Sequence, residues 1–156
     1  MKGKKITTIA ASIGNKEHPA TIACDLQFTY RGSQKFKGST KILSLEGSVP
    51  QNMFGVDKAF IGFSGNADTW GEIVNWFTLQ DGDPPRCKGI EFLMLTDKNQ
   101  IFHGTNLRNW MLIPTTHFSI GSGCDYAMGA MSAGKTPKEA VIISSKHDPM
   151  TGMGCR

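Results

Sequence analysis

The sequence predicts an α+β fold, in which strands and helices occupy separate stretches of the chain. Apolar and polar residues alternate, as in half-buried strands, through much of the first 64 positions and again between positions 90 and 120. Apolar residues recur at helical spacing in one central segment and in two consecutive segments near the C-terminus. With 156 residues, of which 39% are hydrophobic, the chain is long enough to bury a core.

Four strands are predicted in the first half of the chain. Residues 6–13 and 20–30 alternate between apolar and polar side chains, and a polar turn at 14–19 separates them. A weaker strand is predicted at 39–45. A strong one is predicted at 57–64, where the central residues are almost all apolar.

A helix is predicted directly after the fourth strand. Asp68 can cap its first turn, and the turn-forming segment 81–85 ends it. The apolar side of this helix is made by Trp70, Ile73, Val74 and Phe77.

The second half of the chain contains a predicted hairpin, one further strand and two helices. The hairpin pairs 91–96 with 100–103, and the next strand covers 117–120. The helices are expected at about 124–133 and 137–147.

The turn between the last two helices contains two overlapping signals. Thr136, Pro137 and Glu139 form a capping box at the start of the last helix. The segment 129–136 also matches the phosphate-binding P-loop pattern. A P-loop must follow a strand directly, whereas a helix is predicted here, and too few residues follow for parallel βα units. We therefore predict a helix-to-helix turn that binds no nucleotide.

Composition argues against several classes of function. The formal net charge is +4 and the lysines are mostly dispersed, so we expect no nucleic-acid partner. The basic start at Met1–Ile6 is not followed by the apolar run of a signal peptide, and no stretch suits a membrane span. The four cysteines and four histidines lack metal-binding spacing, so no metal or cofactor is expected. Such cysteine usage is typical of a reduced, cytoplasmic setting.

Several short motifs with chemical potential follow one another along the chain. Thr7 and Thr8 lie in the first strand, Asp25 lies within the second, and Lys41 comes 16 positions after Asp25. Taken singly, each of these residues is unremarkable. Their order continues with Gly62 and Gly65 before the first helix, Gly121, Ser122 and Gly123 before the next, and Asp148, Thr151 and Gly152 after the last.

This order resembles the proteasome β-subunit and bacterial HslV branch of the N-terminal-nucleophile hydrolases, over most of the chain with gaps. The resemblance implies a four-layer αββα sandwich, with two antiparallel sheets face to face and helices on their outer faces. It also implies that residues 7–156 form a single proteasome-like domain and that residues 1–6 are an N-terminal extension or propeptide. The family packs its subunits into rings, so a homo-oligomer is expected.

The chemistry that the resemblance implies is peptide hydrolysis through an acyl-enzyme. Thr7 would be the nucleophile, with its freed α-amine as the base, which requires removal of the residues before it. Lys41, held by Asp25, would stabilise the developing charge, and the backbone N–H of Gly62 would be the oxyanion donor. The supporting network would comprise Ser122, Asp148 and Thr151.

By position, the pocket for the residue before the cut would be lined by Phe28, Leu43, Phe60 and Ser64. Three of these four are apolar, which suggests a hydrophobic preference. The substrate would be a peptide or an unfolded protein, and an ATPase unfoldase is the partner that the resemblance implies.

A second function stays open, that of a catalytically silent ring subunit or structural component of a larger assembly such as a virion. Ile6 stands where self-processing relatives usually carry glycine, and its β-branched side chain hinders the required backbone contortion. The helix layer is reduced and the C-terminus short, as expected of a minimal member encoded by a compact viral genome. A neighbouring subunit would cover the sheet edges left bare. The location would then be the cytoplasm or a viral particle.

Overall fold

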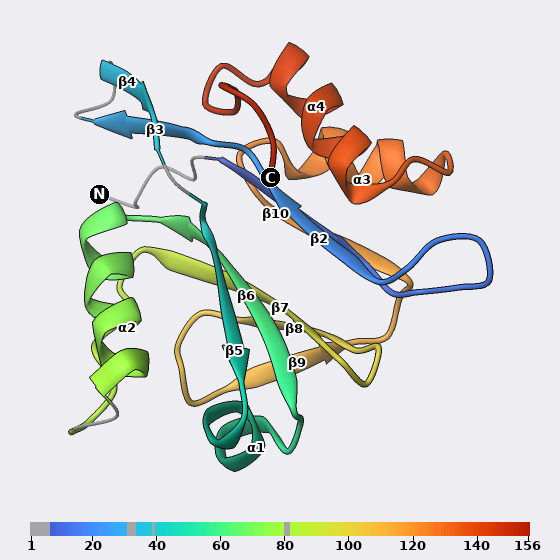
Figure 1. Ribbon diagram of the computed structural model, residues 1–156. Coiled ribbons are helices and arrows are strands. Elements are labelled where there is room, and N and C mark those ends of the chain that lie inside the picture. The colour runs from blue at the N-terminus through green and yellow to red at the C-terminus, as the bar shows by residue number, and fades with distance from the viewer. Residues whose placement is uncertain (1–6, 31–33, 39, 80–81) are drawn as a thin grey trace.

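The computed structural model describes residues 7–30, 34–38, 40–79 and 82–156. Two antiparallel sheets pack against each other, and helices cover the outer face of each (Figure 1). The sequence predicts the α+β class, and the family resemblance implies this sandwich of four layers.

The smaller sheet has the strand order β10-β1-β2. β1 (Thr8–Ser12) lies in the middle and pairs antiparallel with both β2 (Thr21–Cys24) and β10 (His117–Gly121). The outer face of this sheet is covered by α3 (Cys124–Ser132) and α4 (Pro137–His147). β1 is therefore enclosed on both faces and both edges.

The larger sheet has the order β5-β6-β7-β8-β9, and all its pairs are antiparallel. Its outer face packs against α2 (Ala67–Leu79), and the short α1 (Ser48–Phe54) lies at the β5–β6 connection. A separate hairpin of β3 (Gln27–Tyr30) and β4 (Gln34–Lys37) projects beyond the small sheet (Figure 1). The strands of the larger sheet are Ile42–Glu46, Lys58–Gly65, Ile90–Thr96, Ile101–Gly104 and Trp110–Ile113.

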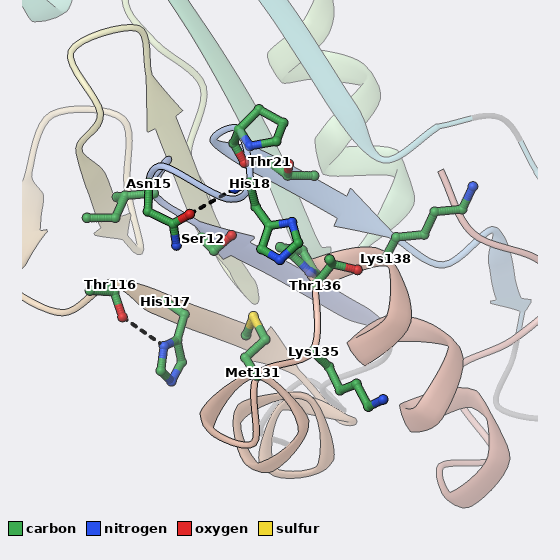
Figure 2. Close-up of a pocket in the computed structure, with 14 residues that line it drawn as sticks. Ser12, Asn15, His18, Thr21, Thr116, His117, Met131, Lys135, Thr136 and Lys138 are labelled. Carbon is green, nitrogen blue, oxygen red and sulfur yellow. Dashed lines mark hydrogen bonds between the residues drawn. The ribbon is translucent and has the colours of Figure 1, made fainter.

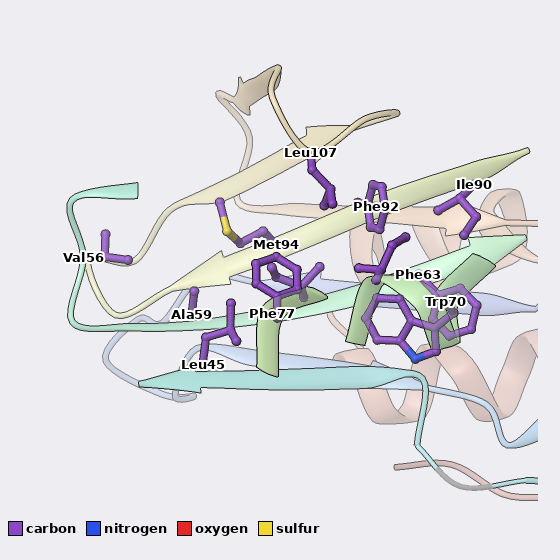
Figure 3. Close-up of a cluster of buried hydrophobic side chains, with 12 residues drawn as sticks. Leu45, Val56, Ala59, Phe63, Trp70, Phe77, Ile90, Phe92, Met94 and Leu107 are labelled. Carbon is purple, nitrogen blue, oxygen red and sulfur yellow. The ribbon is translucent and has the colours of Figure 1, made fainter. Parts of the chain in front are cut away.

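Three apolar clusters fill the three interfaces between layers. The inner cluster, which includes Ile9 and Leu93, lies between the sheets. A small cluster around Ala10 and Val141 joins the smaller sheet to α3 and α4. The largest cluster joins α2 to the larger sheet, where Phe63 stacks on Trp70 with ring centroids 4.2 Å apart (Figure 3). Because side chains on a strand alternate between faces, β1 and β7 each contribute to two clusters.

The predicted elements are mostly confirmed, with five differences. The strand predicted at 20–30 is interrupted after Cys24, because Asp25 turns into the interior, and it resumes as β3. The short elements α1, β4 and β9 were not predicted, since none of them has enough residues to show a period. The cap of α2 is also different: the side chain of Asn66, and not Asp68, accepts the N–H of residue 68 at 2.9 Å.

The turn between α3 and α4 is as predicted. Thr136 accepts the backbone N–H of Glu139 at 3.2 Å, and Glu139 accepts the N–H of Thr136 at 3.1 Å, which completes the capping box. The P-loop-like segment therefore forms the end of one helix and the cap of the next. No helix in the described part of the chain is long and apolar enough to cross a membrane.

Thr136→Ala should destabilise the protein by about 1 kcal/mol, because loss of the Thr136 hydroxyl leaves the Glu139 N–H without its acceptor. For a chain of this size the melting temperature should fall by roughly 2–4 °C, measurable by circular dichroism. Ser145→Ala, which removes a hydroxyl from the same helix away from its start, should change it much less. Equal effects of the two substitutions would contradict the cap.

Candidate active site

The candidate site lies at one end of the sandwich, where segments from both sheets meet. Thr7 immediately precedes β1, and Asp25 directly follows β2, so the two lie side by side in the smaller sheet. Lys41 immediately precedes β5, the edge strand of the larger sheet. A side chain from the larger sheet thus reaches two residues of the smaller one.

Thr7, Asp25 and Lys41 form one hydrogen-bonded cluster. The Lys41 ammonium Nζ lies 2.8 Å from Asp25 Oδ1 and also donates to the hydroxyl Oγ1 of Thr7. The Thr7 hydroxyl in turn donates to the same carboxylate oxygen. The three residues are only 1%, 0% and 2% exposed, so the cluster is almost completely shielded from solvent. The resemblance to the proteasome and HslV family predicted this proximity, and the structure confirms it.

Backbone groups hold the two charged side chains in place. Asp25 Oδ1 accepts the N–H of Thr8 at 3.2 Å, and Oδ2 accepts the N–H of Gly152 at 3.1 Å. Lys41 Nζ also donates to the backbone carbonyl of Gln27 at 2.5 Å. Each ion is therefore fixed in position, as a preorganised catalytic group must be.

Burial shifts the acid–base properties of both ions. Desolvation raises the pKa of Asp25 above its ordinary value, although the neighbouring Lys41 and the backbone N–H groups oppose the shift. Desolvation likewise lowers the pKa of Lys41, against the attraction of Asp25. A lysine with a lowered pKa exchanges protons closer to neutral pH.

The backbone of Thr7 is held in an unusual conformation. Its φ is +84°, a value that β-branched residues rarely adopt. Its N–H donates to the carbonyl of Met150 at 3.2 Å, and its carbonyl accepts from Gly123 N–H and Ser122 Oγ, both at 3.3 Å. Surrounding segments thus enforce the strain, as is common at functional sites.

Glycines 121 and 123 allow this close packing around Thr7 and Thr8. A Cβ on Gly121, whose φ is +95°, would collide with the Thr7 carbonyl. A Cβ on Gly123 would collide with the Thr8 hydroxyl. The glycine spacing noticed in the sequence is therefore required by contact with the two threonines.

A second polar network lies behind Thr7. Asp148 Oδ2 accepts hydrogen bonds from Ser122 Oγ at 2.5 Å and from Thr151 Oγ1 at 2.6 Å. The Thr151 hydroxyl also lies 2.8 Å from that of Thr8. The structure thus brings all three predicted supporting residues together next to Thr7.

A small cavity opens beside the Thr7 hydroxyl, and its volume is about 10 Å³. Gly62, predicted as the oxyanion donor, does not line it. Instead a Cβ on Gly62 would press on the side chain of Ile9, in the core between the sheets. The residues that line the cavity are Thr7, Gln27, Phe28, Lys41, Phe63 and Gly65.

The four residues predicted for the substrate pocket lie in different places. Phe28 lines the cavity beside Thr7, and Leu43 packs in the cluster that faces α2. Phe60 lines a different cavity at the open side of the sandwich. Ser64 is buried, and its hydroxyl lies close to Gly121. The structure does not assemble these four residues into one pocket.

Three residues of the site were missed in the sequence. Phe63 and Gly65 lie on the α2 side of β6, whereas Phe60 and Ser64 lie on its other side. The alternation of side chains along a strand would have identified Phe63 and Gly65 if the side facing α2 had been chosen. Gln27 contributes its backbone carbonyl to Lys41, which no side-chain pattern reveals.

A much larger cavity, of about 380 Å³, lies elsewhere, at the opposite end of β1 from Thr7. It is bordered by the β1–β2 turn, the start of β10 and the α3–α4 turn, and Figure 2 shows His18, His117 and Thr136 around it. No group of three or more His, Cys, Asp or Glu side chains that could hold a metal ion occurs among the described residues.

Comparison with known proteins adds information on the fold. No protein-family model matches the sequence, and no curated protein matches it either. The structure is similar to HslV from Trypanosoma brucei, with a TM-score of 0.64 and 17% identity over 96% of this chain and 97% of that one. It is also similar to Anbu from Pseudomonas aeruginosa, in a helical assembly, with a TM-score of 0.70 and 11% identity over 96% and 79% of the chains.

A third similar structure is Anbu, an ancestral β-subunit, from Yersinia bercovieri. Its TM-score is 0.67 and its identity 11%, over 96% of this chain and 78% of that one. At such identities the likeness establishes the fold. The chain has the α+β sandwich of HslV and Anbu, as the sequence motifs led us to expect.

Lys41→Met should destabilise the protein by about 3–5 kcal/mol near neutral pH, because it leaves the Asp25 carboxylate buried without its partner. The lone carboxyl would have a folded-state pKa above its unfolded value of about 4. Below the unfolded value both states are protonated and the penalty vanishes, and it grows as the pH rises towards the folded value. Urea unfolding at about pH 4 and pH 8 should show this difference.

The double variant Asp25→Leu with Lys41→Met removes both charges and should recover much of the lost stability at about pH 8. If Lys41→Met lowered the stability equally at both pH values, the loss would not come from a buried Asp25 carboxylate that lacks its partner.

Proposed function

We propose that the chain is a threonine peptidase of the proteasome and HslV kind, with Thr7 as its nucleophile. The observation that supports this most strongly is the contact of one buried hydroxyl with both a lysine ammonium and a carboxylate. In this arrangement Lys41 stabilises the developing alkoxide, and Asp25 orients both partners. The fold shared with HslV agrees with the assignment.

The proposed reaction starts with removal of Met1–Ile6, which converts the Thr7 amide into a free α-amine. This amine takes the hydroxyl proton, directly or through a water, while Oγ1 attacks the scissile carbonyl. Collapse of the tetrahedral intermediate breaks the C–N bond as the α-ammonium returns its proton to the leaving nitrogen, and an ester remains on Thr7. Water then attacks the ester and gives a proton to the α-amine, and the second collapse returns this proton to Thr7 Oγ1 and releases the acid product.

The Gly65 N–H suits the role of oxyanion donor better than that of Gly62. The N–H of Phe63 donates to the carbonyl of Lys41, on the β5 side of β6. N–H groups alternate between the two sides of an antiparallel strand, so the N–H of Gly62 points towards β7. The N–H of Gly65 points to the β5 side of β6, beyond the point where the pairing with β5 ends. Gly65, moreover, lines the cavity beside Thr7.

Ser122, Asp148 and Thr151 would then position the α-amine. The Thr7 nitrogen lies 3.2 Å from the Met150 carbonyl, in the loop that Asp148 and Thr151 organise. The network supplies an acceptor for the amine and a carboxylate near its positive charge.

A silent structural subunit is the second candidate. Ile6 precedes Thr7, and in the intact chain the Thr7 nitrogen is an amide, which is not a base. In this function the same fold would serve as a component of a larger assembly, such as a virus particle. Proteolytic activity of the shortened chain distinguishes the two.

We further propose that the chain assembles with copies of itself, most simply into a ring, as implied by its resemblance to proteasome-type subunits. β9 forms one edge of the larger sheet, and its Met111 and Leu112 are 61% and 49% exposed. An apolar strand edge of this kind is usually covered in native proteins. Peptides or unfolded proteins would be the substrates, delivered by an ATPase unfoldase, in the cytoplasm or a viral particle.

A chain that starts at Thr7, released from a cleavable fusion, should hydrolyse fluorogenic peptides, whereas the full chain should be inactive. The rate should rise as the α-amine, with an ordinary pKa of about 8, loses its proton. Thr7→Ala should lower kcat/KM at least roughly a thousandfold, since it removes the nucleophile. Thr7→Ser, which keeps both hydroxyl and amine, should retain part of the rate.

The shortened chain must first be shown to fold and to oligomerise like the full chain. If it then shows no peptide cleavage that a threonine-directed inhibitor blocks, the peptidase proposal fails and the structural subunit remains.

In solution the protein should be an oligomer, most simply a ring of six or more copies. Light scattering at micromolar concentration measures the mass directly. Met111→Lys together with Leu112→Glu should weaken the assembly if β9 lies in the interface, because charges on a strand edge oppose pairing. A monomer mass for the unaltered chain would rule out the ring.

A further inference from the structure

The cavity beside Thr7 is too small for a large side chain. Its volume of about 10 Å³ corresponds to roughly one water molecule. The carbonyl carbon under attack must come within about 3–3.5 Å of Thr7 Oγ1. The side chain of the residue that carries this carbonyl therefore lies next to Thr7, in or at the mouth of this cavity.

Two aromatic rings occupy the space that a deeper pocket would use. Phe63 is 2% exposed and stacks on Trp70 with an interplanar angle of 12°, so the hydrophobic cluster holds it firmly. Figure 3 shows the rings of Phe63 and Trp70 within that cluster. Phe28 approaches from the other side, with Lys41 Nζ 5.0 Å from its ring centroid.

Phe28 is also confined. A Cβ on Gly38 would collide with the Phe28 ring, so this ring lies directly against the Gly38 backbone. A large substrate side chain would have to displace Phe28 from both Gly38 and Lys41, or drive Phe63 into a filled core. Overpacking of this kind is unfavourable.

We propose that this site selects a small residue, glycine, alanine or serine, immediately before the cleaved bond. The inference rests on the proposed peptidase function and specifies its substrate class. The apolar character of the predicted lining residues suggested a hydrophobic preference, but the space that Phe28 and Phe63 leave limits the size of the side chain. These two residues are the specificity determinants.

The test measures binding and cleavage separately, with the chain that starts at Thr7. Acetylated tripeptide acids that end in alanine or leucine represent the first product of the reaction, and their binding by equilibrium titration requires no catalysis. Fluorogenic amides of the same peptides report cleavage. The alanine peptide should be preferred over the leucine peptide by at least about tenfold in both measurements.

Phe28→Ala should open the cavity and shift the preference towards leucine by at least about tenfold. Phe63→Leu, which keeps an apolar side chain in the core, provides a second variant should the first fail to fold. Phe102→Ala is the matched control: Phe102 is also partly buried and packs against the same cluster, but it does not line the cavity. This control should keep the alanine preference.

Equal binding of both peptides by the unaltered chain, binding of neither, or an unchanged preference in the folded Phe28 and Phe63 variants would each overturn the inference. An alanine preference in binding with no cleavage of any amide would support the inference while showing that the peptidase function is wrong.

Discussion

The buried ion pair between Asp25 and Lys41 is the interaction on which the arrangement of the site depends. It is the point at which the larger sheet reaches the smaller one at this end of the sandwich, and the Thr7 hydroxyl is bound to both members. Removing two charges from water is expensive unless every hydrogen-bonding group is matched. The backbone N–H groups of Thr8 and Gly152 and the carbonyl of Gln27 provide that match. The ion pair consequently determines where three separate segments must lie.

The last eight residues complete this arrangement. Gly152 donates to Asp25, Met150 accepts from Thr7, and Pro149 accepts from the side chain of Gln27. Arg156 exchanges two backbone hydrogen bonds with Cys24, so the end of the chain extends the smaller sheet beside β2. The C-terminal segment thus holds Thr7 and Asp25 in place, and their geometry depends on residues far away in sequence.

Sequence motifs predicted the fold and the meeting of Thr7, Asp25 and Lys41, because these residues are placed by strand ends whose order the motifs preserve. The supporting residues Ser122, Asp148 and Thr151 were found for the same reason. The substrate side was predicted less well. Phe60, Gly62 and Ser64 were assigned by their positions in the resemblance, and they lie on the opposite face of β6 from Phe63 and Gly65, which line the cavity beside Thr7. The β3–β4 hairpin and the carbonyl of Gln27 depend on tertiary contacts that no local pattern contains.

The energetics of the site bear on the choice between a peptidase and a silent subunit. Apolar residues of similar volume in place of Asp25 and Lys41 would often stabilise a fold as well or better. Thr7 is held at a positive φ, at an expected cost of about 1–3 kcal/mol. A purely structural subunit gains nothing from a strained threonine whose hydroxyl contacts two buried charges. The strained Thr7 backbone and the two buried charges are expected where a nucleophile must be activated, and for this reason we favour the peptidase.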